Sequence, residues 1–262
     1  MTDFVISADG TRIAYDRVGS GPVVIFVAAA LQFRAFDPTT VEMARLLAEH
    51  GFTVINYDRR GRGESTDHLP FDVDREVEDI VALIDETGGE AALFGSSSGG
   101  VLALWAAAAS IGVTALALWE VPLDLEDDGS ESLRGLRERA AANDRAGTVE
   151  FFMRNMPPEW FENTKNSPAW PTLLEVSPTL VYDAAVLERA QSGTPFAMQW
   201  ETVTVPTLVM HGAQTLPLFP VASRAIAEAL PHARVLEIEA ANHGWKPEVM
   251  AGLLAEFFSA EQ

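Results

Sequence analysis

Residues 91–100 read AALFGSSSGG and set three consecutive serines between glycines. The apolar residues before the serines are typical of a short buried strand, and the residues after them, GGVLALWAAAA, are typical of a buried helix. The pattern Gly-x-Ser-x-Gly fits one register only, with glycines at 95 and 99 and the serine at 97. Small residues on either side let a strained strand-to-helix turn present a reactive hydroxyl. Ser97 is therefore a candidate nucleophile, and a capping turn without chemistry is the alternative.

Seven further short runs, rich in apolar and β-branched residues, predict strands. They cover residues 4–7, 12–17, 23–27, 53–57, 113–119, 207–211 and 234–238. The Asp-Gly pair in ADGT predicts a hairpin between the first two. Helical patterns at 37–50, 72–87, 98–110, 219–230 and 247–259 alternate with the later runs. Because apolar strands separated by helices form parallel sheets covered on both faces, we predict an α/β fold with a mainly parallel eight-stranded sheet.

Residues 122–205 interrupt this alternation. The segment contains no convincing strand, is helical and punctuated by proline, and is rich in aromatic residues. An insertion of this length is too long for an ordinary loop. We expect a core of residues 1–121 and 206–262, with residues 122–205 forming a helical cap over one end of the sheet.

Composition narrows the possible partners. The chain has 262 residues, no cysteine and a net charge of -20. The lack of cysteine excludes disulfides and thiolate nucleophiles, and the acidic surface disfavours nucleic acid. No signal-peptide pattern and no run of about 18 apolar residues is present. Neither a nucleotide-binding fingerprint nor a metal-ligand cluster is evident. We expect a cytoplasmic monomer or homodimer that acts on a small molecule, without membrane, cofactor or metal.

A serine nucleophile needs a base, and histidine is the usual one. His243 lies in EAANHGWKP, after the last predicted strand and before the last helix. Loops at the carboxyl ends of parallel strands converge on one edge, so this loop can reach Ser97. His68, in the loop after GRGEST, is a minor candidate. The other histidines fit structural roles at a helix end, in a buried strand and in an exposed turn; they are His50, His211 and His232.

Several segments together resemble the α/β-hydrolase family over nearly the whole chain. They are VVIFVAAALQFRAFD, NYDRRGRGEST, GSSSGG, LALWEVP, PTLVMHG and ANHGW. In that family the catalytic order is nucleophile, acid, histidine, and Ser97 and His243 match its first and last members. The resemblance thus implies that GSSSGG is the nucleophile elbow of a serine hydrolase. It also implies that DRRGRGES is a structural turn held by Asp58, Arg60 and Ser65.

The triad acid departs from the usual family pattern. The common position, a few residues after the strand that reads TLVMHG, holds Thr215, which carries no charge. The family's second position follows the strand before the cap, where Glu120 ends ALALWE. The resemblance therefore implies Glu120 as the acid that orients His243, with Asp124 in reserve. The alternative is that Glu120 pairs with an arginine at the cap hinge.

The family also holds the reacting oxygen in an oxyanion hole of two backbone N–H groups. One donor belongs to the residue after the nucleophile, here Ser98. The other belongs to the x of a His-Gly-x loop, where this chain has Val27-Ala28-Ala29, so the donor is Ala29.

The resemblance implies a cofactor-free serine hydrolase, similar to carboxylic ester hydrolases. It would cleave an ester, thioester or lactone of a small apolar molecule through Ser97, His243 and Glu120. Two alternatives remain open at this point: a ligand-sensing receptor with little turnover, and a C–C bond hydrolase or perhydrolase using the same triad.

Overall fold

The computed structural model describes residues 2–109 and 112–261 and contains one eight-stranded sheet. The strand order is β1-β2-β4-β3-β5-β6-β7-β8, in which β1 and β2 are antiparallel to their neighbours and the other neighbours are parallel. Each predicted strand run overlaps one observed strand. The strands are β1 (Asp3–Ile6), β2 (Arg12–Gly19), β3 (Val23–Val27), β4 (Thr53–Tyr57), β5 (Ala91–Ser96), β6 (Val113–Trp119), β7 (Thr207–Gln214) and β8 (Ala233–Ala241). The predicted mainly parallel α/β sheet is confirmed.

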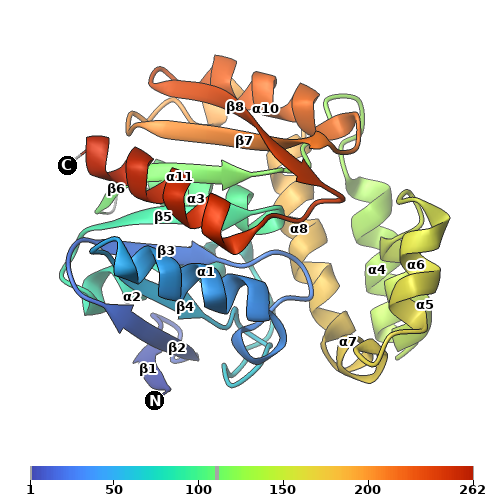
Figure 1. Cartoon of the computed structure of the whole chain (residues 1–262). Coiled ribbons are helices and arrows are strands. Elements are labelled where there is room, and N and C mark those ends of the chain that lie inside the picture. The colour runs from blue at the N-terminus through green and yellow to red at the C-terminus, as the bar shows by residue number, and fades with distance from the viewer. Residues whose placement is uncertain (1, 110–111, 262) are drawn as a thin grey trace.

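Helices cover both faces of this sheet (Figure 1). On one face lie α1 (Pro38–Glu49) and α11 (Pro247–Ala260), which also pack against each other. On the other face lie α2 (Val73–Glu86), α3 (Ser98–Ala108) and α10 (Leu218–Ala229). All five core helices were predicted; the predicted end of α3 at Ser110 lies outside the described residues.

The alternation of side chains along the central strands explains why two helical layers are needed. In β3, Val24 and Phe26 belong to the apolar cluster under α1 and α11, whereas Ile25 and Val27 belong to the cluster under α2 and α3. All four side chains are almost completely buried. A strand that is apolar on both faces must be covered on both, which is what the VVIFV run encodes.

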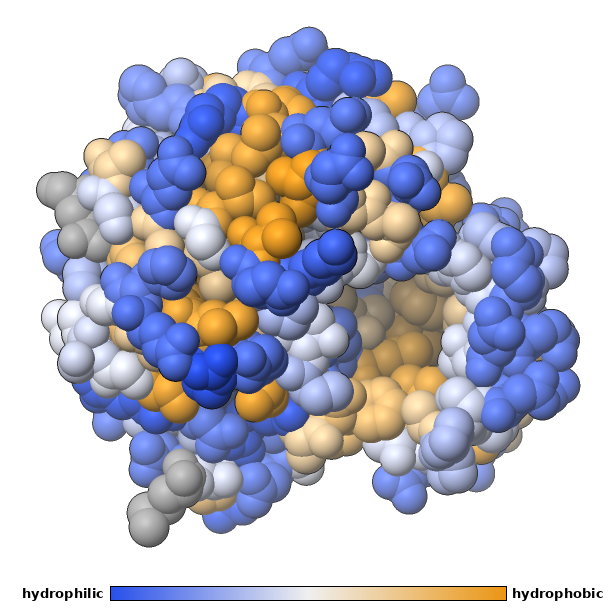
Figure 2. All heavy atoms as spheres, in the orientation of Figure 1, coloured by the Kyte–Doolittle hydropathy of each residue, from blue (hydrophilic) through white to orange (hydrophobic). Residues whose placement is uncertain are grey.

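The segment between β6 and β7 consists of helices and the turns that connect them, without a strand. It contains α4 (Ser130–Ala141), α5 (Arg145–Phe152), α6 (Pro158–Lys165), α7 (Trp170–Val176), the 3₁₀ turn η2 (Ser177–Thr179), α8 (Leu180–Gln191) and α9 (Phe196–Gln199). A second 3₁₀ turn, η1 (Arg34–Phe36), precedes α1. Helix α8 packs on α2 and α3, and α4 to α7 extend beyond the carboxyl ends of the strands (Figure 1). Figure 2 shows a hollow between these helices and the core, with a largely hydrophobic floor.

The turn from β5 to α3 is closely packed against its surroundings. Ser97 has φ 53° and ψ −126°, a backbone conformation that residues other than glycine rarely adopt. A Cβ on Gly99 would lie 2.2 Å from the carbonyl oxygen of Val27 and 2.6 Å from that of Ala28. A Cβ on Gly95 would lie 2.6 Å from the Cα of Gly100. The first turn of α3 therefore touches the loop after β3 backbone to backbone.

We predict that Gly99→Ala lowers the free energy of unfolding by roughly 2 kcal/mol, because the new methyl group overlaps a backbone oxygen that cannot move independently. Chemical denaturation of the variant and of the wild type measures the difference. Gly252→Ala in α11 is the matched control, since a Cβ there meets nothing within 4 Å. It should raise stability by about 0.5 to 1 kcal/mol, as alanine favours helix. Equal stability of Gly99→Ala and the wild type would contradict the close approach.

Candidate active site

Ser97, Glu120 and His243 follow β5, β6 and β8 at the carboxyl edge of the sheet. Backbone hydrogen bonds join the strand ends: Ser97 N donates to Trp119 O at 2.9 Å, and Glu120 N donates to Met210 O at 2.9 Å. Like Ser97, Glu120 and His243 have positive φ angles, 41° and 63°. Three residues in uncommon backbone conformations thus stand at one edge, a clustering typical of functional sites.

The side chains of Glu120 and His243 are hydrogen-bonded. Glu120 Oε2 lies 2.5 Å from His243 Nδ1, and Glu120 Oε1 accepts the Gly212 N–H at 3.0 Å. Glu120 is completely buried. Burial opposes ionisation, but the bonds from His243 and Gly212, with a contribution from the Thr215 side chain, hold the pKa of Glu120 below its usual value. Among the described residues no arginine pairs with this carboxylate.

An ionised Glu120 can only accept a hydrogen bond. Nδ1 of His243 must therefore carry a hydrogen and donate a hydrogen bond to the carboxylate. A neutral ring then keeps a free lone pair on Nε2, as a general base requires. Phe219 of α10 stacks on the imidazole, with ring centroids 4.9 Å apart and an interplanar angle of 14°. Trp119 Nε1 donates to the carbonyl oxygen of His243 at 3.3 Å. Glu120 and Phe219 therefore restrain the imidazole and Trp119 restrains the His243 backbone, while 28% of the His243 side chain stays exposed.

In the described residues the hydrogen bonds of His243 run to Glu120 and Trp119, and a bond to Ser97 Oγ is not among them. Ser97 itself is half-buried. Catalytic hydrogen bonds often tighten only when substrate is bound, so the Ser97–His243 pairing belongs to the proposal below.

The other candidates from the sequence occupy different surroundings. Asp124 accepts the N–H of Glu126 at 2.9 Å and so closes a local turn. His68 is exposed in its loop. His211 is buried, with its Nδ1 unpartnered among the described residues. Thr215, at the family's usual acid position, is close enough to Glu120 to contribute to its lowered pKa.

The two candidate oxyanion donors lie on either side of the contact made by Gly99. Ser98 is buried at the start of α3, where backbone N–H groups have no partner within the helix. The Ala29 N–H donates to the side-chain oxygen Oε1 of Gln32 at 3.0 Å. The sequence did not mark Gln32, because nothing in its spacing shows that it folds back on the loop. Ala28 needs no left-handed backbone; the residue of this loop with positive φ is Leu31.

A second unpredicted feature is a buried cluster of charges beside Ser98. The described contacts of Arg60 run outward to Asp79, Asp9 and the backbone of Arg75, as a structural turn requires. Arg59 and Arg62 instead point inward and form ion pairs with Asp183 of α8. The sequence pattern of the turn gives no sign of this difference, since Asp183 is more than 120 residues away along the chain.

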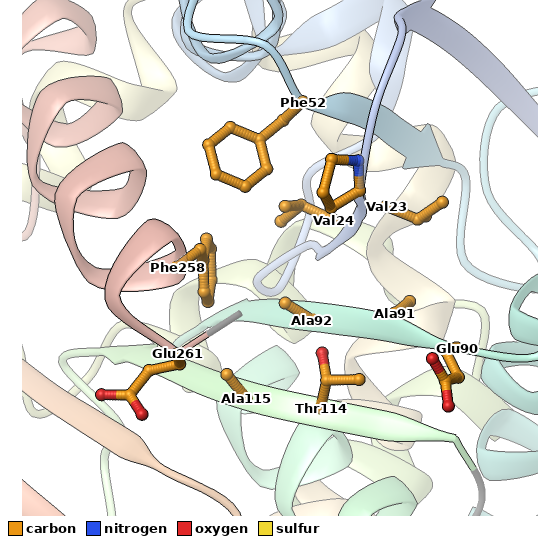
Figure 3. Close-up of a pocket in the computed structure, with 11 residues that line it drawn as sticks. Val23, Val24, Phe52, Glu90, Ala91, Ala92, Thr114, Ala115, Phe258 and Glu261 are labelled. Carbon is orange, nitrogen blue, oxygen red and sulfur yellow. The ribbon is translucent and has the colours of Figure 1, made fainter.

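Cavities elsewhere lack this chemistry. Figure 3 shows the residues that line a cavity at the amino ends of β3, β5 and β6, the opposite edge of the sheet. The volume of this cavity is about 410 Å³. Its lining combines Phe52, Phe258 and small apolar residues with the carboxylates of Glu90 and Glu261.

Within residues 2–109 and 112–261, no group of three or more His, Asp or Glu side chains could hold a metal ion. No helix of the described chain is both long and apolar enough to cross a membrane.

Comparison with known proteins agrees with the fold. A family model described as "Alpha/beta hydrolase family" matches residues 24–253. The crystal structure of an alpha/beta hydrolase from Sphaerobacter thermophilus is 37% identical, with a TM-score of 0.87 over 98% of this chain and all of the other. A non-heme haloperoxidase from Rhodococcus erythropolis is 26% identical over 92% of each chain. An esterase from Exiguobacterium antarcticum shares the fold, at 23% identity, with a TM-score of 0.76 over 99% of this chain and 100% of the other.

Proposed function

Because the chain belongs to the alpha/beta hydrolase family and is thus an enzyme of the hydrolase type, we propose that it cleaves an ester, thioester or lactone through Ser97, His243 and Glu120. The observation that carries the proposal is the 2.5 Å hydrogen bond from His243 to the buried carboxylate of Glu120. It supplies an oriented base at the same edge of the sheet as the strained turn that holds Ser97. A ligand-sensing receptor, the alternative from the sequence, is set aside with the assignment to hydrolases.

In the proposed reaction, Ser97 Oγ attacks the substrate carbonyl carbon while Nε2 of His243 takes the proton of the Ser97 hydroxyl. Glu120 stabilises the imidazolium that forms and stays ionised. His243 then passes the proton to the leaving group, and the bond from the carbonyl carbon to that group breaks. A water molecule, deprotonated by His243, hydrolyses the acyl-enzyme and restores Ser97.

The developing oxyanion would be held by the backbone N–H groups of Ser98 and Ala29. Removing one such donor costs about 3 to 4 kcal/mol in related enzymes, so both matter to the rate. The Ala29 donor already has an acceptor, Gln32 Oε1 at 3.0 Å. In our proposal the substrate oxygen replaces the amide oxygen of Gln32, and Gln32 competes with weakly bound substrates.

The hydrophobic floor of the hollow in Figure 2 supports a small apolar substrate. Because the protein carries a net charge of -20, it would repel a strongly anionic substrate as that substrate approaches.

Perhydrolysis is the second candidate, favoured by the relative named as a non-heme haloperoxidase. In that reaction hydrogen peroxide replaces water: His243 takes a proton from the peroxide, its oxygen attacks the acyl carbon, and the bond to Ser97 Oγ breaks. The proton returns to Ser97, and the product is a peracid. Formation of peracid from an ester and hydrogen peroxide, abolished in Ser97→Ala, distinguishes this activity from simple hydrolysis.

A fluorophosphonate probe tests the nucleophile. We predict one stoichiometric adduct on Ser97, located by mass spectrometry, because the reagent needs an activated serine and an oxyanion hole rather than a specific substrate. Ser97→Ala should give no adduct while keeping the wild-type melting temperature. An adduct on Ser96 instead, or none at a dose that labels a reference hydrolase, would overturn the proposal.

The acid is tested by two matched variants of neighbouring carboxylates. Glu120→Gln should lower kcat by at least about 100-fold, because a neutral amide neither fixes the His243 tautomer nor stabilises the imidazolium. Asp124→Asn should leave kcat within about twofold, since its contacts close a local turn. Esters that the unlabelled wild-type enzyme turns over serve as substrates. The reverse pattern would show that Asp124 is the triad acid.

We predict that Gln32→Ala raises the second-order rate constant of probe labelling by up to about tenfold, the value of one hydrogen bond that no longer has to be displaced. Gln32→Glu is the matched comparison, since it keeps an acceptor beside Ala29 and adds a charge that repels the oxyanion. It should slow labelling. If Gln32→Ala slows labelling as strongly as Gln32→Glu, Gln32 does not compete for the donor.

A further inference from the structure

We propose that Asp183, in helix α8 of the insertion, is a positioning residue that fixes both oxyanion donors. The inference rests on the proposed function and deepens it. It assigns to the insertion a part in the chemical step, in addition to shaping the substrate hollow.

Asp183 touches the residue that carries the first donor. The Ser98 hydroxyl donates to Asp183 Oδ1 at 2.6 Å and accepts a hydrogen bond from Arg59 Nη1 at 3.2 Å. Arg59 Nη1 also donates to Asp183 Oδ1 at 2.7 Å, so the three groups form a closed triangle. Ser98 is the first residue of α3, so the orientation of the first helical turn sets the direction of its backbone N–H. The triangle therefore restrains the donor from the side chain of the same residue.

The second donor is reached through the two arginines that Asp183 binds. Arg59 Nη1 donates to Ala28 O at 3.2 Å, and Arg62 Nη1 donates to Ala29 O at 2.7 Å. Arg62 Nη2 in turn donates to Asp183 Oδ2 at 2.6 Å. The Ala28 carbonyl belongs to the same planar peptide unit as the Ala29 N–H, and the Ala29 carbonyl belongs to the next unit. Fixing both carbonyls fixes the direction of that N–H.

The cluster is buried and its charges balance. The side chains of Arg59, Arg62, Asp183 and Glu76 are 0 to 2% exposed, and two positive charges face two negative ones. Burial raises the pKa of Asp183, but Arg62, Arg59 and Ser98 outweigh it and hold that pKa below its usual value. Each arginine binds a different oxygen of Asp183, and Arg59 also forms a bidentate contact with Glu76. Charge-assisted hydrogen bonds in a buried site are directional and tolerate little displacement. Such a cluster can transmit the position of α8 to the donors.

Anchoring the insertion does not by itself require these contacts. Tyr182 donates to Asp67 at 2.6 Å and stacks on Phe71, and Arg189 pairs with Asp74. These contacts already join α8 to the core. The bond from Asp183 to Ser98 adds little to the anchor, whereas it acts directly on the residue beside the nucleophile.

The test compares Ser98→Ala with Asp79→Asn. Ser98→Ala keeps the backbone N–H and all four charges but removes the link to Asp183. Asp79→Asn is the matched control: it weakens a buried ion pair of the same turn, with Arg60, which contacts neither donor. Asp183→Asn is the stronger variant. Because it leaves a buried arginine without its full partner, its folding is checked by circular dichroism and thermal melting.

We expect Ser98→Ala to slow fluorophosphonate labelling of Ser97 and lower kcat by about tenfold, with KM within about threefold, because a displaced donor acts on the transition state. Asp183→Asn should slow both by about 100-fold. Asp79→Asn should lower the melting temperature without slowing labelling.

Wild-type labelling rates in folded Ser98→Ala would overturn the inference, whether or not Asp183→Asn folds. Equal slowing in Asp79→Asn would also overturn it, since that result points to general destabilisation. If the wild type itself is not labelled on Ser97, the proposed function fails, and the inference fails with it. The two failures are therefore distinguished by the wild-type reaction.

Discussion

The close approach of the α3 first turn to the loop after β3 is the constraint on which the site depends. With a Cβ at residue 99 only 2.2 Å from the Val27 carbonyl oxygen, glycine alone lets the two backbones meet. This contact brings Ser97, Ser98 and the 28–29 loop together, so the two proposed oxyanion donors come from segments that meet only here. The strain in Ser97 is then sustained by the parallel strands on both sides of β5, whose backbone bonds leave the turn no alternative path.

Charge is the second organising influence around this contact. An acidic protein with a net charge of -20 nevertheless buries three arginines in a single turn, Arg59, Arg60 and Arg62. Each is stabilised by carboxylates brought from distant segments: Glu76 and Asp79 from α2, Asp183 from the insertion. An unpaired buried charge costs several kcal/mol, so these pairs make the relative placement of turn, helix and insertion a requirement of folding.

The sequence predicted the sheet well and the site in part. Continuous apolar runs such as VVIFV carry their own evidence of burial on both faces, so all eight strands and the five core helices could be predicted. His243 was predicted from the topology that brings strand ends to one edge, and Glu120 from the acid position that the family resemblance implies. Gln32, Phe219 and Asp183 could not be predicted. Their roles depend on side-chain directions and on contacts across the insertion, and a single sequence encodes neither as a local pattern.

The position of Glu120, the proposed acid, shows how an equivalent contact with His243 can be made from a different strand. In the parallel register of β6 and β7, Trp119 lies opposite Met210, so Glu120 follows beside His211 and Gly212. From there its carboxylate accepts the Gly212 N–H and reaches His243 across the end of β7. A carboxylate at Thr215, after β7, would approach the same ring from the neighbouring strand. Two carboxylates there would repel each other and raise one pKa, so a single acid is the electrostatically stable arrangement. The uncharged side chain of Thr215 therefore allows Glu120 to stay ionised beside it.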